Sequence, residues 1–169
     1  CLRAASVTRN GKIGVLGTLG TIRSGKYLQT LKKLNSGLEI YSKACPMFVP
    51  LVENGYLDCS VTQMIAQEYL LPLKKANVDT LILGCTHYPL LRPLIQRLMG
   101  DDVTLVDAGA ETAVYAKEQL EKAGLLCGRG YGSAQYYVSD ATEGFTELAG
   151  MFLEKQIEGS VHAVNIESY

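Results

Sequence analysis

Short apolar runs rich in β-branched residues alternate along this chain with longer amphipathic segments. Because parallel strands need a long crossover between them, this alternation predicts an α/β fold, with a mostly parallel sheet flanked by helices. Strands are expected over residues 12–18, 38–45, 80–85, 103–107, 134–138 and 161–166. Helices are expected over residues 24–34, 60–76, 89–99, 110–123 and 142–156.

The distribution of charges and the spacing of the cysteines exclude several classes of function. The 16 basic and 17 acidic residues are mixed along the chain and give a net charge of -1, so no nucleic-acid partner is expected. No apolar run reaches the roughly 20 residues of a membrane-spanning helix, so no membrane partner is expected either. The 5 cysteines lack CxxC spacing and fit neither a disulfide framework nor a zinc site. We therefore expect no metal and a reducing, cytoplasmic location.

The strongest motif for chemistry is Gly-Cys-Thr-His-Tyr-Pro at residues 84–89, which follows the apolar run 80–83 and precedes a predicted helix. In open parallel sheets, ligands bind beyond the carboxyl ends of the strands, where Cys85 is expected. A helix N-terminus and the nearby His87 both favour a thiolate, which can act as a base. An isolated strand cysteine is more often a buried apolar residue, but the company of Thr86 and His87 favours a functional role.

A Gly- and Thr-rich segment follows the first predicted strand. Its hydroxyl and free N–H groups suit a carboxylate or a phosphate, and Thr18 and Thr21 are the candidate hydroxyls. Residues 20–26 match the phosphate-loop pattern GxxxxGK, but Tyr27 stands where a Ser or Thr must reach magnesium. With Asp107 as its acidic residue, a P-loop-like nucleotide hydrolase is therefore only a minor alternative.

A third segment, residues 44–55, leaves the second predicted strand and passes two prolines before Glu53. Taken alone, Glu53 would be a solvated acid, because most carboxylates lie at the surface. Cys45, Cys59 and Cys127 are expected to be core or incidental thiols.

These segments together resemble the glutamate racemases in order and spacing. The matching residues are Gly17-Thr18 with Thr21, Ser24 and Tyr27, then Cys45-Pro46 with Glu53, then Leu83-Gly84-Cys85-Thr86-His87-Tyr88-Pro89, then Val106-Asp107-Ala108-Gly109, and then Tyr136-Tyr137-Val138-Ser139. The resemblance covers nearly the whole chain. It implies an enzyme that interconverts L- and D-glutamate without a cofactor and supplies D-glutamate for peptidoglycan.

The resemblance also implies roles for the chemical residues. Inverting a stereocentre through a planar carbanion needs proton removal on one face and proton delivery on the other. By resemblance, Cys85 is one of the two acid/base residues, His87 tunes or relays its proton, and Glu53 is an auxiliary acid. Aspartate-specific relatives commonly carry glutamate at position 87, so a histidine there favours glutamate as the substrate.

Substrate binding is implied for three hydroxyl residues, Thr18, Thr21 and Thr86, which resemble the binders of the substrate's carboxylate or ammonium group. Their hydrogen bonds would matter because no pyridoxal phosphate accepts the electrons of the carbanion.

Two motifs of the family, Asp-Ser-Gly and the Ala-Cys-Asn-Thr that bears the opposite cysteine, do not occur in these residues. We therefore expect a C-terminal part of a racemase that is inactive, or nearly so, by itself. Residues 11–105 would form one complete α/β domain, and residues 106–169 a remnant of a second. Such a remnant predicts exposed apolar surface, or a homodimer or rearranged packing that covers it. A non-catalytic glutamate-binding or interaction module is the main alternative.

Overall fold

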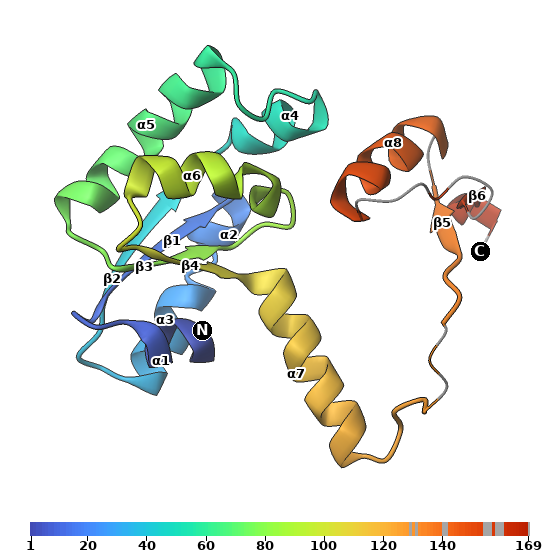
Figure 1. Cartoon of the computed structure of the whole chain (residues 1–169), viewed down its shortest axis with the longest axis horizontal. Helices are drawn as coiled ribbons and strands as arrows, with labels where there is room; N and C mark the ends of the chain where they lie inside the picture. Colours follow the sequence, from blue (N-terminus) through green and yellow to red (C-terminus); the bar gives the residue numbers. More distant parts are fainter. Residues whose placement is uncertain (129, 131, 140–141, 154–156, 158–160, 169) are drawn as a thin grey trace. The chain divides into compact units, whose positions relative to one another are not determined.

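The computed structural model describes residues 1–128, 130, 132–139, 142–153, 157 and 161–168. The chain forms two compact units, Cys1–Ala123 and Gly124–Tyr169 (Figure 1). The division expected at residue 105 rests on the family resemblance and stays a prediction.

A four-stranded sheet in the order β2-β1-β3-β4 forms the centre of the first unit (Figure 1). Its strands are β1 (Lys12–Gly17), β2 (Glu39–Ala44), β3 (Thr80–Leu83) and β4 (Thr104–Asp107). All three pairings are parallel, which confirms the predicted α/β fold. Because parallel strands share a direction, their four carboxyl ends lie at one edge of the sheet.

Helices cover both faces of this sheet (Figure 1). Successive strand residues point to opposite faces and so enter two different cores. One core lies under α4 (Phe48–Glu53), α5 (Ser60–Lys75) and α6 (Arg92–Met99), and its strand residues include Leu16, Leu81, Leu83 and Leu105. The other lies under α1 (Leu2–Val7) and α3 (Lys26–Leu34), and its strand residues are Ile13, Val15, Ile82 and Val106. The two central strands, β1 and β3, are mostly apolar because both of their faces are buried, whereas the edge strand β2 also carries exposed polar residues.

Short helices account for most differences from the predicted elements. Neither α1, nor α2 (Leu19–Arg23), nor α4 was predicted, because five or six residues make fewer than two turns and show little periodicity. Helix α4 accommodates Pro50 in its first turn, where the backbone N–H has no intrahelical partner. The helix predicted over residues 89–99 is divided into a 3₁₀ turn, η1 (Tyr88–Leu91), and α6.

Helix α7 (Ala108–Lys122) begins two residues earlier than predicted. Its start is fixed by Asp107, whose carboxylate accepts hydrogen bonds from the backbone N–H of Gly109 at 2.8 Å and of Ala110 at 3.2 Å. An aspartate is a strong N-cap because it satisfies N–H groups that have no partner within the helix.

The second unit is a smaller α/β arrangement. Strands β5 (Tyr136–Val138) and β6 (Val161–Ala163) pair in parallel, with α8 (Thr142–Leu153) between them in the chain and a 3₁₀ turn, η2 (Ile166–Ser168), after them. Residues 154–156 of the helix predicted over 142–156 lie outside the described residues. Among the described residues from 124 onward, only Ile157 is buried.

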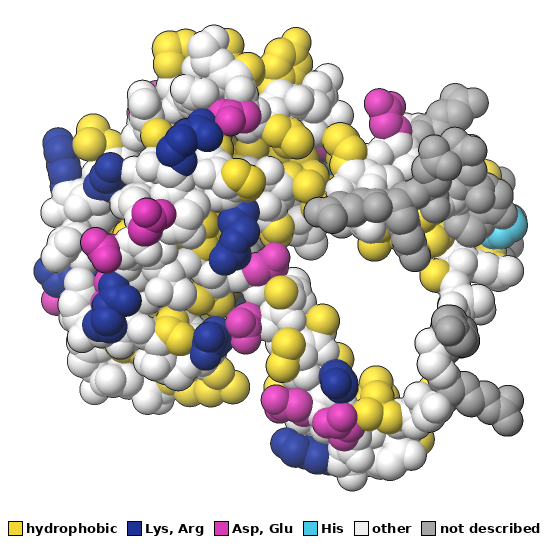
Figure 2. All heavy atoms as spheres, viewed as in Figure 1, with side chains coloured by type: hydrophobic (Ala, Val, Ile, Leu, Met, Phe, Trp, Pro, Cys, Tyr) yellow, Lys and Arg dark blue, Asp and Glu magenta, His cyan; other side chains and the backbone are white. Residues whose placement is uncertain are grey.

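Charged side chains of both signs are interspersed over the visible face of the first unit (Figure 2). Helix α7 also carries exposed apolar side chains, among them Val114, Tyr115 and Leu120. Within the described part of the chain, no helix combines the length and the apolar character needed to cross a membrane.

Candidate functional site

The candidate residues gather where the strands of the first unit end. Gly17 lies opposite Ala44 in the β1–β2 pairing, and Leu16 lies opposite Leu83 in the β1–β3 pairing. The backbone continues this register, since the N–H of Gly84 donates to the carbonyl of Leu16 at 2.8 Å. The residues that follow β1 and β3, among them Thr18 and Cys85, therefore leave neighbouring strands at the same edge of the sheet.

A line of three side chains starts at Cys85, which is half-buried at the end of β3. Its Sγ lies 4.0 Å from Nδ1 of His87. The opposite ring nitrogen, Nε2, lies 3.1 Å from Oε1 of Glu53 at the C-terminal end of α4. The His87 side chain is 20% exposed and that of Glu53 is 48% exposed, so the line runs from the protein interior toward water.

The carboxylate of Glu53 selects the tautomer of His87. An ionised carboxylate only accepts hydrogen bonds, so Nε2 of the imidazole must carry a proton. In the neutral ring, Nδ1 is then an acceptor that faces both the Cys85 thiol and the hydroxyl of Thr86, which is 3.2 Å away. This arrangement allows His87 to take a proton from Cys85 and leave a thiolate, which is the basic and nucleophilic form of cysteine.

Two further predicted residues, Thr18 and Thr21, lie together at the start of α2. The Thr18 hydroxyl accepts a hydrogen bond from the Thr21 backbone N–H at 3.2 Å and so caps the helix. Their two hydroxyl oxygens are 3.0 Å apart. The structure thus brings Thr18 and Thr21 together beside the end of β1, while their role in substrate binding stays a prediction.

Tyr27 belongs to the same region, although the sequence argument gave it no role of its own. A Cβ atom at position 84 would lie 2.7 Å from the carbonyl oxygen of Leu16 and 3.2 Å from Cε2 of Tyr27. Gly84 therefore lets the tyrosine ring approach the backbone directly before Cys85. Burial raises the pKa of Tyr27, and the negative charge of a Cys85 thiolate raises it further. No local sequence pattern predicts this contact, because Tyr27 and Gly84 are far apart in the chain.

Cys45 directly follows β2 at the same edge but is a core residue, as predicted. It is fully buried, and burial raises the pKa of its thiol to about 12, a rise that Lys43 partly opposes. Its carbonyl accepts a hydrogen bond of 3.0 Å from the hydroxyl of the buried Tyr88. This bond ties the chain after Cys85 to the end of β2. Cys45 itself stays a neutral thiol and cannot serve as a base near neutral pH.

The phosphate-loop alternative is not supported by the local structure. Much of residues 20–26 forms helix α2 instead of an open loop. The N–H groups of Ile22, Ser24 and Gly25 donate to the backbone carbonyls of Thr18, Gly20 and Ile22, at 3.0 to 3.1 Å, and are therefore not free to hold a phosphate. Asp107, the proposed acidic partner, is engaged as the N-cap of α7.

Among known proteins, glutamate racemases are similar to this chain in sequence. Comparison with models of protein families found no match. The chain is 45% identical over 167 residues to a glutamate racemase of Geobacter metallireducens, which covers 98% of this chain and 62% of that protein. It is 50% identical over 123 residues to a glutamate racemase of Listeria monocytogenes, which covers 73% of this chain and 46% of that protein. The chain thus spans about three fifths, or less, of the length of these curated relatives.

Solved structures of glutamate racemases are similar in fold as well. The isoform RacE1 of Bacillus anthracis aligns with a TM-score of 0.91 at 38% identity, over 98% of this chain and 61% of that one. The enzyme of Francisella tularensis, solved in complex with D-glutamate, aligns with a TM-score of 0.89 at 30% identity, over 99% of this chain and 63% of that one. By sequence and by fold, this chain corresponds to about three fifths of a glutamate racemase.

Proposed function

We propose that this chain supplies one of the two acid/base residues of a cofactor-independent glutamate racemase, and that Cys85 is that residue. The observation that carries the proposal is the line from the Cys85 thiol through His87 to Glu53, with contacts of 4.0 Å and 3.1 Å. A thiol at a strand end, half-exposed and facing an imidazole acceptor, is suited to exchange a proton with a bound substrate.

The proposed step is a proton transfer in which no electrons leave the substrate. A Cys85 thiolate takes the α-proton of one glutamate enantiomer and becomes a thiol, and the electron pair of the broken C–H bond remains on the α-carbon. A second acid then delivers a proton to the opposite face. In the reverse direction the Cys85 thiol is the donor. Between turnovers in the forward direction, His87 accepts the thiol proton and releases it to water, which restores the thiolate, and Glu53 stabilises the imidazolium while it lasts.

Thr18, Thr21 and Thr86 are proposed to bind the substrate. A planar carbanion next to a carboxylate places negative charge on the carboxylate oxygens, and hydroxyl donors aimed at those oxygens stabilise that charge. The D-glutamate complex of the Francisella tularensis relative supports glutamate as the substrate class.

Exchange of the α-proton in deuterated water tests the proposal, using the protein encoded by the complete gene. Cys85→Ser should abolish racemisation, because an alcohol is a far weaker base than a thiolate. Cys127→Ser, which changes an exposed thiol outside the candidate site, is the matched control and should keep wild-type activity. Wild-type protein that binds glutamate without any α-proton exchange would instead support the binding-module alternative.

The wider setting is proposed from the family resemblance. The product D-glutamate would serve peptidoglycan synthesis, in the cytoplasm, and the protein would act as a homodimer. Loss of the gene should therefore create a requirement for external D-glutamate. Light scattering during gel filtration should give twice the mass of one chain, and a single-chain mass would contradict the dimer.

A further inference from the structure

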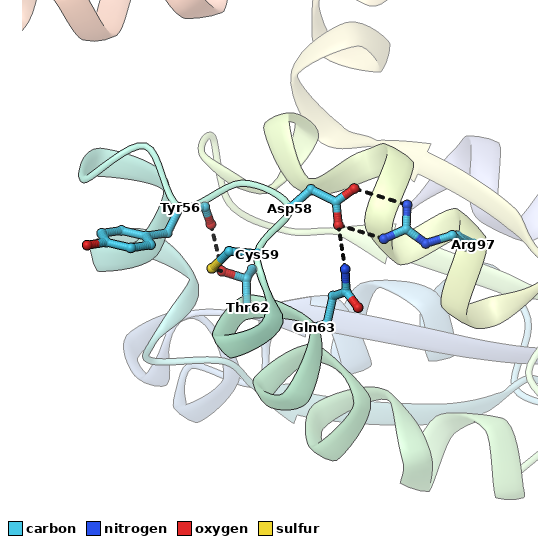
Figure 3. Close-up of polar contacts among 6 residues, drawn as sticks. All are labelled: Tyr56, Asp58, Cys59, Thr62, Gln63 and Arg97. Atoms are coloured by element: carbon cyan, nitrogen blue, oxygen red, sulfur yellow. Dashed lines mark hydrogen bonds and ion pairs between the residues drawn. The ribbon is translucent and has the colours of Figure 1, made fainter.

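A polar cluster outside the proposed catalytic line joins the α4–α5 connection to helix α6 (Figure 3). Arg97 on α6 donates two hydrogen bonds to Asp58, from Nη2 to Oδ1 at 2.6 Å and from Nη1 to Oδ2 at 3.1 Å. Gln63 on α5 donates a third to the same carboxylate, from Nε2 to Oδ1 at 3.0 Å. Two parallel bonds from one guanidinium fix the orientation of the carboxylate as well as its distance.

The connection between Glu53 and Asp58 is itself held by hydrogen bonds. Backbone N–H groups of Gly55 and Tyr56 donate to the carbonyls of Val52 and Leu51, at 3.0 and 2.9 Å. The carbonyl of Tyr56 in turn accepts a 2.7 Å hydrogen bond from the hydroxyl of Thr62, which is fully buried on α5 (Figure 3). The short connection that carries Asp58 is therefore held against the end of α4, where Glu53 stands.

Arg97, which pairs with Asp58, lies on the same segment of the chain as His87, which contacts Glu53. His87 directly precedes η1, and α6 follows η1 without a break, so Arg97 and His87 belong to one continuous stretch of structure. Two polar side-chain contacts thus join the segments, the exposed Asp58–Arg97 pair and the Glu53–His87 contact, besides the packing of Phe48 against Tyr88. The Asp58–Arg97 pair therefore restricts how far Glu53 can move away from His87.

We propose that Asp58 and Arg97 are positioning residues, which hold Glu53 in hydrogen-bond range of His87. The inference rests on the proposed function, because it assigns a purpose to the Glu53–His87 contact within a racemase. Both side chains of the pair are about half-exposed, at 53% and 51%, so the ion pair adds little to the stability of the fold. We expect the ion pair to affect the position of Glu53 relative to His87 instead.

Racemisation kinetics test the inference in the protein encoded by the complete gene. Asp58→Asn should lower kcat roughly tenfold, because small misplacements of supporting groups are costly in catalysis, and should leave KM nearly unchanged. The exchanged pair, Asp58→Arg with Arg97→Asp, should restore most of the loss because it rebuilds the contact with the same net charge. Glu68→Gln removes a negative charge from an exposed position on α5 and should have no effect.

A second measurement does not depend on activity. The chain contains 2 histidines, His87 and His162, so the imidazole ¹⁵N resonances can be assigned with a His162→Gln variant. Glu53→Gln should shift the His87 resonances, and Asp58→Asn should shift them in the same direction. Unchanged His87 resonances in Asp58→Asn would overturn the inference, as would a loss of kcat that the exchanged pair fails to restore. An inactive wild type whose His87 resonances respond to Asp58→Asn would refute the racemase proposal and leave the positioning role standing.

Discussion

The carboxylate of Asp79, at the start of β3, offers a quantitative test of how the first unit is held together. It accepts four hydrogen bonds, three from the consecutive residues 8–10 and one from its neighbour: Thr8 Oγ1 at 2.7 Å, Arg9 N at 2.6 Å, Asn10 N at 2.7 Å and Thr80 Oγ1 at 2.9 Å. These bonds fasten the connection between α1 and β1 to the amino end of β3. We therefore expect Asp79→Ala and Asp79→Asn to destabilise this unit.

The size of the effect follows from the groups left without partners. Asp79→Ala removes the acceptor for two backbone N–H groups, and each unpaired buried donor costs about 1–3 kcal/mol. Because Arg9 and Asn10 are exposed and water reaches their surroundings, the lower half of that range applies, which gives about 2–4 kcal/mol in total. Asp79→Asn keeps one carbonyl oxygen but loses the charge, and should cost about 1–2 kcal/mol.

Urea unfolding of the 169-residue chain, followed by circular dichroism, measures these changes. Asp101→Asn is the matched control, since Asp101 is an exposed acid before β4, and should change the unfolding free energy by less than about 0.5 kcal/mol. Equal midpoints for Asp79→Ala, Asp101→Asn and the wild type would refute the reasoning.

The same residue gives the stability a pH dependence. Burial alone would raise the pKa of Asp79, but the hydrogen bonds from Thr8, Asn10, Arg9 and Thr80 outweigh it and hold the pKa below its ordinary value. The carboxylate therefore contributes stability in full above the unfolded-state pKa of about 3.9. That contribution is lost as the pH falls through the lower pKa of the folded state. The free-energy difference between the wild type and Asp79→Asn should accordingly shrink below about pH 4.

Three further predictions concern the edge that carries Cys85. Gly84→Ala should cost about 1–3 kcal/mol in urea unfolding, because the new Cβ would lie 2.7 Å from the carbonyl oxygen of Leu16, which cannot rotate away. Tyr88→Phe should cost about 0.5–1.5 kcal/mol, since it removes the 3.0 Å hydrogen bond to the buried carbonyl of Cys45, which keeps the backbone N–H of Phe48 as a donor; no change in the urea midpoint would contradict this. Iodoacetamide at pH 8 should label the exposed Cys127 and leave Cys45 of the native protein unlabelled, because Cys45 is buried and its pKa is raised to about 12. Equal labelling of the two cysteines in peptide mass spectrometry would contradict this prediction.

The sequence was most informative where physical constraints act locally. The run Thr80–Leu83 is buried throughout and mostly apolar because both faces of β3 are covered, so the strand could be predicted from its composition. Cys85 and His87 are two residues apart, so their proximity followed from the motif.

The rest of the site depends on contacts between distant residues. Glu53 and His87 are 34 positions apart, and nothing local to Glu53 distinguishes it from a solvated acid. The packing of Tyr27 on Gly84 is equally long-range, and six-residue α4, which sets the position of Glu53, is too short to show a period. Only the resemblance to a family linked Glu53 with Cys85 before the structure was known.

The residues at the two ends of β3 differ in their expected roles: Asp79 at the amino end stabilises the fold, and Cys85 and His87 at the carboxyl end belong to the candidate site. At its amino end, Asp79 is nearly buried and its hydrogen bonds are satisfied by the chain itself, so substitutions there should change the unfolding free energy. At its carboxyl end, Cys85 and His87 are only partly buried, as the proposed exchange of protons with a ligand requires. A strand of four residues is short enough for both ends to be fixed by one set of neighbours, β1 and β4. Asp79→Asn should therefore lower the unfolding free energy while the His87 ¹⁵N resonances stay unchanged under native conditions. Asp58→Asn should shift the His87 resonances and leave the unfolding free energy nearly unchanged.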